Sequence, residues 1–256
     1  MQRKSRLFLS TVLAFSLCTA PMFSAFAQEA SPEDTNTQDT SQPDTSADPS
    51  SDAADTDTAG SDQEGSPSDI PYEKGTLTDT DYESTWLNLK FTPPSTVIMN
   101  TEEEMQSVMQ QGQASLSDST GVELNEDSLS GTVYEMMASS ATGFPYVNLV
   151  VEDAVMENMN ADQYLQTAQQ VLDATGQEYT YTDITDTQIG GLDFRVMEST
   201  TTINDYQIIQ KYCTRRQGEK FVSIILSYTT DTTAEADEIL AAFTPLNTDT
   251  EAASAE

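Results

Sequence analysis

Histidine is absent from this chain of 256 residues, and other residues of common catalytic machinery are scarce. Without an imidazole there is no Ser-His-Asp or Cys-His nucleophile system, and zinc or haem has no histidine ligand. The many acidic residues single out no carboxylate pair of the kind that glycosidases hold in a cleft. We therefore expect a protein that is not an enzyme and carries no cofactor.

Basic residues are also few, since 10 Lys and Arg stand against 43 Asp and Glu. The resulting net charge of −33 at pH 7 repels phosphate backbones and anionic lipid headgroups. Nucleic acid and anionic membrane surfaces are thus excluded as expected partners.

The first 27 residues have the pattern of an export signal. Basic residues precede a short apolar stretch, and small residues lead up to a cleavage site expected between Ala27 and Gln28. The apolar stretch is shorter than the roughly 20 residues of a comfortable membrane span. We expect a secreted or extracytoplasmic protein with no stable span once the leader is removed; the alternative is an uncleaved anchor.

Cysteine is limited to Cys18 and Cys213. Lipidation at Cys18 is a second alternative for the leader, but the preceding residue is Leu17 where a small residue is usual. After leader removal Cys213 stands alone, so no intramolecular disulfide forms and the core must hold the domain together.

Composition divides the remaining chain into three parts. Residues 28–70 are rich in Asp, Ser, Thr and Pro and contain no Lys or Arg. Such a segment cannot offset its ordering entropy, so we expect a disordered acidic linker. Residues 71–246 carry the apolar patterning of a folded domain, and residues 247–256 are expected to be a disordered tail.

Three segments have the 3.6-residue periodicity of amphipathic helices. Their apolar positions run from Met105 to Gly112, from Ala161 to Leu172 and from Ala236 to Phe243. Capping residues are expected at Thr101 with Glu104, at Asn160, and at Thr232 with Glu235.

Strands are expected where β-branched and aromatic residues gather. The expected strands are Thr85–Thr92, Thr132–Ser139, Tyr146–Glu152, Glu178–Thr187, Leu192–Thr201, Tyr206–Arg216 and Lys220–Thr229. Turn signals at Asn204-Asp205 and Gln217-Gly218 make the last three an antiparallel meander. Because Phe221–Leu226 is apolar on both faces, the prediction is an α+β fold: an antiparallel sheet of about six or seven strands with helices on both faces.

Three local patterns add a family resemblance to this element order. Leu89-Lys90-Phe91-Thr92-Pro93 is similar to an opening strand that ends in proline. Asn148–Val151 with the helix starting at Ala161 is similar to a strand-to-helix unit, and Ile189–Phe194 to a glycine-containing turn before a central strand. Together they resemble the PsbP-like and DcrB-like superfamily, which has many exported bacterial members.

The resemblance extends from Tyr82 to Leu246 and implies a PsbP-like α/β/α sandwich. Members of this superfamily are mostly non-enzymatic partners of larger assemblies, so it also implies a binding or scaffold role. No functional residue carries over from the family.

Five basic residues fall in one short span: Arg195, Lys211, Arg215, Arg216 and Lys220. Lys211, Cys213 and Arg215 alternate onto one strand face, and Arg216 and Lys220 flank the Gln217-Gly218 turn. On so acidic a protein, Lys211, Arg215, Arg216 and Lys220 form a candidate site for a carboxylate or a wall-polymer phosphate. The alternative is that they neutralise nearby acids or protect a sheet edge.

Other candidate sites have simpler interpretations. Gly190-Gly191 fits a turn with positive φ better than a phosphate cradle, and Cys213 fits the core better than an activated thiolate. Met156 and Met159 are the methionine pair whose exposure decides between core filling and a surface role.

The resemblance, together with the missing catalytic residues, therefore implies an exported, non-catalytic binding or scaffold module at the bacterial cell envelope. Its partner is expected to be an envelope protein or a cell-wall component. Two alternatives remain: a hydrolase without histidine that uses Ser/Lys or paired carboxylates, and a calcium-dependent surface protein, suggested by the many aspartates.

Overall fold

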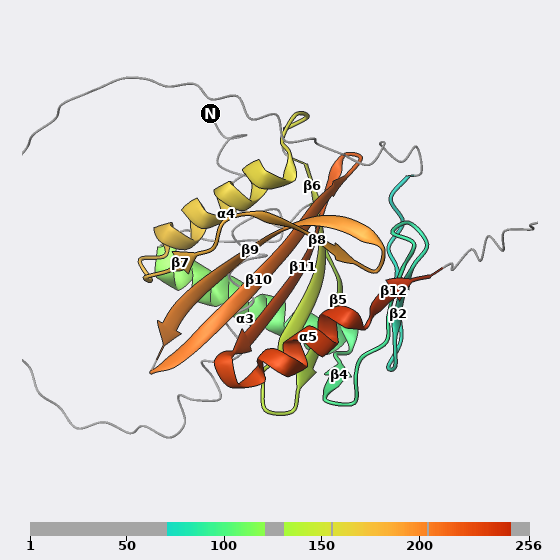
Figure 1. Ribbon diagram of the computed structural model, residues 1–256, viewed down its shortest axis with the longest axis horizontal. Coiled ribbons are helices and arrows are strands. Elements are labelled where there is room, and N and C mark those ends of the chain that lie inside the picture. Colours follow the sequence, from blue (N-terminus) through green and yellow to red (C-terminus); the bar gives the residue numbers. More distant parts are fainter. Residues whose placement is uncertain (1–70, 121–130, 155, 204, 247–256) are drawn as a thin grey trace, which may run out of the picture.

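The computed structural model describes residues 71–120, 131–154, 156–203 and 205–246. The predicted leader with its Ala27–Gln28 cleavage site, the linker at 28–70 and the tail at 247–256 lie outside these ranges. Within the ranges, the chain forms three α-helices and two antiparallel sheets (Figure 1). The predicted mixture of helices with antiparallel sheet is confirmed.

The larger sheet has eight strands. In spatial order they are β4 (Val97–Met99), β5 (Thr132–Ser140), β6 (Tyr146–Asp153), β11 (Lys220–Thr229), β10 (Tyr206–Gln217), β9 (Leu192–Ile203) and β7 (Thr180–Tyr181), with β8 (Thr185–Ile189) also paired to β9. The predicted meander of the last three long strands is confirmed, because β9, β10 and β11 pair antiparallel in sequence. The strand predicted over Glu178–Thr187 is instead two short strands, β7 and β8, that share one neighbour.

A smaller sheet of four strands joins both ends of the folded region. Its order is β1 (Thr76–Leu77), β2 (Tyr82–Ser84), β3 (Leu89–Phe91) and β12 (Phe243–Pro245). Of the single strand predicted over Thr85–Thr92, only β3 is present, because the chain turns before it at Asn88, whose φ is 51°. Phe243 was expected to end a helix, but it pairs with Phe91, and the two ring centroids lie 4.5 Å apart.

The helices are α3 (Glu102–Thr120), α4 (Ala161–Ala174) and α5 (Thr233–Ala241). Thr101 and Glu104 form the predicted capping box. The Thr101 N–H donates to Glu104 Oε2 at 2.8 Å, and the Glu104 N–H donates to Thr101 Oγ1 at 3.2 Å. Asn160 caps α4 as predicted. Thr232 makes no cap bond to α5; it closes a 3₁₀ turn instead, so the third predicted cap is wrong.

No helix in the described part of the chain combines the length and the apolar character needed to cross a bilayer.

Alternate side chains of the larger sheet build two separate cores. Helices α3 and α4 cover one face, where the rings of Tyr164 and Phe221 stack with centroids 4.5 Å apart. The other face is covered by α5 and by the smaller sheet through Leu89, Phe91 and Phe243. The sequence predicted helices for both faces, but it did not predict the second sheet.

Glu135 is a buried carboxylate in an irregularity of β5, where the register shifts between Tyr134 and Met136. Only 1% of Glu135 is exposed, and it accepts hydrogen bonds from Tyr72 Oη (2.5 Å), Tyr82 Oη (3.0 Å) and Gly75 N (2.8 Å). Burial, assisted by Glu135, raises the pKa of both tyrosines well above the ordinary value, so they remain donors. We call these three bonds the Glu135 clasp; they fix the start of the folded chain to the larger sheet.

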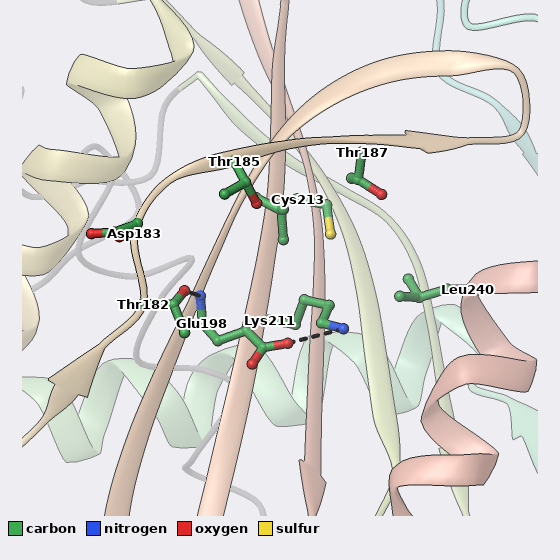
Figure 2. A pocket seen from close by; sticks show the side chains of 9 residues that line it. Thr182, Asp183, Thr185, Thr187, Glu198, Lys211, Cys213 and Leu240 are labelled. Atoms are coloured by element: carbon green, nitrogen blue, oxygen red, sulfur yellow. Dashed lines mark hydrogen bonds and ion pairs between the residues drawn. The ribbon is translucent and has the colours of Figure 1, made fainter.

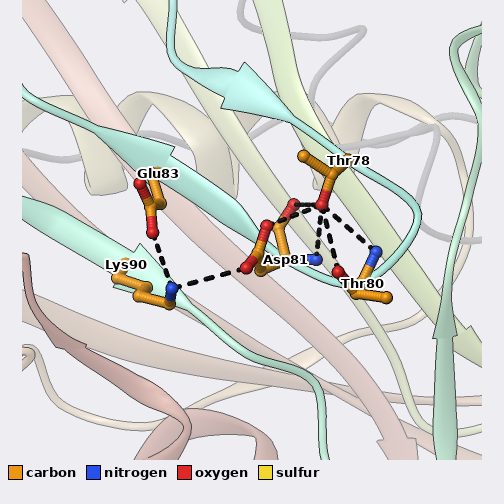
Figure 3. A network of polar contacts seen from close by, with 5 residues as sticks. All are labelled: Thr78, Thr80, Asp81, Glu83 and Lys90. Carbon is orange, nitrogen blue, oxygen red and sulfur yellow. Dashed lines mark hydrogen bonds and ion pairs between the residues drawn. The ribbon is translucent and has the colours of Figure 1, made fainter.

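The turn between β1 and β2 is organised around Thr78 (Figure 3). Its hydroxyl donates to Asp81 Oδ1 at 2.6 Å and accepts from the backbone N–H groups of Thr80 and Asp81. Lys90 Nζ lies 3.4 Å from Asp81 Oδ2 and 2.6 Å from Glu83 Oε1. The Thr78 hydrogen bond, followed by Lys90, holds the pKa of the Asp81 carboxyl below its usual value.

Thr78→Val should therefore have a pH-dependent effect on stability. At pH 7 we expect the free energy of unfolding to fall by about 1 kcal/mol, because the bond to the ionised carboxylate is lost. A carboxyl whose pKa is lower in the folded chain stabilises fully above its unfolded pKa of about 3.9, and that contribution disappears as the pH falls through the folded-state pKa. Urea titrations at neutral and acidic pH should show that the difference in free energy of unfolding between wild type and Thr78→Val becomes smaller on acidification. A difference that does not change with pH would contradict the prediction.

Candidate functional site

A pocket of about 420 Å³ opens on the α5 face of the larger sheet (Figure 2). Its walls come from β9, β10, α5 and the edge formed by β7 and β8. The lining residues are Thr182, Asp183, Thr185, Thr187, Val196, Glu198, Lys211, Cys213 and Leu240. They meet because residues two apart on a strand share a face, and because the ladder of β9 and β10 places Lys211 directly opposite Glu198.

The central feature of the pocket is the ion pair between Lys211 Nζ and Glu198 Oε1, at 2.9 Å. These side chains are 22% and 31% exposed, so the pair is partly buried. Tyr228 Oη also donates to Glu198 Oε1 at 3.2 Å, and its ring lies 5.9 Å from Lys211 Nζ. Burial, followed by the charge of Glu198, raises the pKa of Tyr228 above its usual value, so this phenol stays a donor.

The rim of the pocket is held in place from both sides of the sheet. Thr182 exchanges two bonds with Glu198: its N–H donates to the Glu198 carbonyl at 3.0 Å, and its hydroxyl accepts from the Glu198 N–H at 2.9 Å. On the opposite face, Arg195 binds Asp162 of α4 in a two-pronged contact at 2.5 and 3.1 Å and also binds Asp186. The rim is therefore a fixed part of the sheet edge.

Cys213 lies at the base of the pocket and is fully buried. Burial raises the pKa of its thiol to about 12, and the opposing effect of Lys211 is smaller. At neutral pH the side chain is a protonated thiol that packs against the core, so it does not supply the activated thiolate considered from the sequence.

We accordingly expect Cys213 to resist alkylation in the folded protein. In the chain lacking residues 1–27, iodoacetamide at about pH 8 should react at least about 100-fold more slowly without denaturant than in guanidinium chloride. Mass spectrometry of the modified chain measures this rate. Equal rates would show that the thiol is accessible in the native state.

The four basic candidates have four different environments. Lys211 lines the pocket, whereas Lys220 pairs with Asp153 and lies 4.6 Å from the ring centroid of Tyr72. Arg216 donates to the carbonyls of Gly218 (3.0 Å) and Met159 (2.8 Å).

Arg215 is the candidate whose surroundings are least complete. Its guanidinium carbon lies 5.8 Å from the Phe194 ring centroid, and burial lowers the pKa of the group. Arg215 Nε has no hydrogen-bond partner among the described residues. Of the four candidates, Arg215 therefore carries an unused donor, while Arg216 and Lys220 are already occupied by neighbouring groups.

The other candidates from the sequence lie outside the pocket lining and have structural positions. Gly190 and Gly191 have φ values of 59° and 78° in the turn between β8 and β9, as expected for a turn. Met156 is 54% exposed, whereas Met159 is buried. Across the described ranges, no group of three Cys, Asp or Glu side chains gathers in a way that could hold a metal ion.

Comparison with known proteins shows a likeness in fold only. No protein-family model matches the chain, and no curated protein matches it in sequence. A solution structure of cyanobacterial PsbP (CyanoP) from Synechocystis sp. PCC 6803 is similar at 10% identity and a TM-score of 0.41, over 68% of this chain and 97% of that chain. A crystal structure of LpqN, involved in cell envelope biogenesis of Mycobacterium tuberculosis, is similar at 10% identity and a TM-score of 0.33. The similarity covers 61% of this chain and 82% of that chain. The first of these structures is a PsbP protein, the group named by the resemblance in the sequence.

Proposed function

We propose that the chain is an exported, non-catalytic binding module of the cell envelope whose ligand occupies the pocket beside α5. The observation that carries this proposal is the half-buried Lys211–Glu198 pair within a pocket of about 420 Å³. Ligand sites in proteins are typically concavities of roughly 300–1,000 Å³ in which a few polar groups converge on an apolar wall. Here Val196, Cys213 and Leu240 supply that wall.

The chemistry of the lining supports binding over catalysis. Cys213 is a buried, protonated thiol, and Lys211 and Glu198 neutralise one another. A Ser/Lys hydrolase requires a serine nucleophile, and no serine is among the described residues that line the pocket. We assign ligand contact to Lys211, while Arg216 and Lys220 maintain the hairpin. Arg215 lies outside the pocket lining, and its unused Nε donor is buried.

The cellular setting of the proposal comes from the sequence. We propose that the leader pattern over residues 1–27 exports the chain and that the acidic segment 28–70 serves as a spacer before the binding domain at 71–246. The partner is then an envelope protein or a cell-wall component within reach of that spacer.

Retention of an envelope component by the mature full chain tests the proposal. Thr185→Trp places a large ring at the exposed pocket rim, and Thr180→Trp puts the same ring on the same sheet edge outside the lining. Immobilised wild type and Thr180→Trp should retain one component of an envelope extract that Thr185→Trp loses. Equal retention by all three would place the ligand elsewhere. Ester, glycoside or peptide hydrolysis that Lys211→Ser abolishes would contradict the non-catalytic assignment.

A further inference from the structure

The pocket presents fixed charges of both signs within a small space. Figure 2 shows Glu198 and Lys211 facing one another, while the carboxylate of Asp183 at the rim points away from both. The lining therefore holds two carboxylates and one ammonium group. Because Lys211 and Glu198 lie 2.9 Å apart, a ligand with a single charge that pairs with one of them meets the like charge of the other at close range.

The charged groups also keep unused hydrogen-bonding capacity. Glu198 Oε1 accepts from both Lys211 and Tyr228, while Glu198 Oε2 has no partner among the residues that the structure describes. An ammonium group has three N–H donors, and Lys211 Nζ directs one contact to Glu198. Asp183 is exposed at the rim and, within the described ranges, makes no ion pair. A cationic donor, Lys211, and anionic acceptors, Glu198 and Asp183, thus remain available to a ligand.

An apolar wall lies beside these charges. Val196 and Cys213 come from neighbouring strands, and Leu240 faces them from α5. Cys213 is fully buried and uncharged, so this side of the pocket suits a short hydrocarbon group and disfavours a second charge.

We propose that the ligand of this pocket is a small zwitterion with a short aliphatic group. Its carboxylate binds Lys211, its ammonium group binds Glu198 Oε2, and its hydrocarbon part lies against Val196, Cys213 and Leu240. This inference rests on the proposed function, because it specifies what the same pocket binds.

Three probes of one shape separate the contributions of the two charges. Leucine has both groups, 3-methylbutylamine lacks the carboxylate, and 4-methylpentanoate lacks the ammonium group. Calorimetry on the mature full chain should show leucine binding about tenfold or more tightly than either single-charge probe. In Lys211→Met, leucine should bind no more tightly than 3-methylbutylamine. Thr180→Trp should leave all three affinities unchanged, and Thr185→Trp should abolish leucine binding.

The outcomes distinguish this inference from the proposed function. Equal affinities for leucine and the amine, or leucine binding that survives Lys211→Met, would overturn the zwitterion assignment. If no probe binds while Thr185→Trp still loses an envelope component, the ligand class is wrong and the pocket remains the binding site. If no probe binds and no envelope component depends on Thr185, both proposals fail.

Discussion

Replacing Glu135 with alanine is expected to lower the free energy of unfolding by about 3–5 kcal/mol. The substitution removes the acceptor for Tyr72 Oη, Tyr82 Oη and Gly75 N. Tyr82 is fully buried, so water cannot replace the carboxylate at its hydroxyl without opening the core. The entry segment of the chain would also lose its attachment to the larger sheet.

Guanidinium titration followed by circular dichroism measures this effect. Glu219→Ala is the matched control, because Glu219 is an exposed carboxylate in a turn, and its removal should change stability by less than about 0.5 kcal/mol. Tyr72→Phe removes one bond of the clasp and should cost about 1 kcal/mol. A loss at Glu135→Ala no larger than at Tyr72→Phe would show that the clasp does not act as a unit.

Gly190→Ala is expected to destabilise the protein by about 2–4 kcal/mol. Gly190 has a φ of 59°, and a Cβ atom there would lie 2.2 Å from Leu89 Cδ1. Leu89 is fully buried in the smaller sheet, where it packs in the core shared with α5, so it cannot move aside freely. The substitution therefore combines backbone strain with a steric clash between the two sheets.

Gly176→Ala separates the two effects. Gly176 has a φ of 77°, but a Cβ atom there would have nothing within 4 Å. This control should show the backbone strain alone, about 1–2 kcal/mol. Urea titrations of both variants give the difference that the clash contributes, and equal losses would mean that Leu89 adjusts without cost.

Long, regular elements could be predicted from the sequence. The meander of β9, β10 and β11 follows from strands of ten or more residues with short turns between them, and α4 from a clear apolar stripe after a capping residue. The smaller sheet could not be predicted in the same way. Its strands have two or three residues, too few for alternation to be visible, and Phe243 continues the spacing of the α5 stripe.

Two of the nine lining residues of the candidate site were within reach of the sequence. Lys211 and Cys213 were placed on one face by alternation, but Glu198 was missed. The signal was the short connection between β9 and β10: once Ile203 pairs with Tyr206, an unbroken ladder places Glu198 opposite Lys211. The position of Leu240 and the threonine rim depend on tertiary packing, which local periodicity does not encode.

The Glu135 clasp determines how the domain would carry mechanical load. Tension applied through residues preceding Tyr72 acts first on Tyr72 and Gly75, and both bind a carboxylate of the larger sheet. The ladder between β1 and β2 has only two paired positions and would peel apart under a small force. By passing such a pull directly to β5, the clasp would spare that weak hairpin and direct the load into the larger sheet.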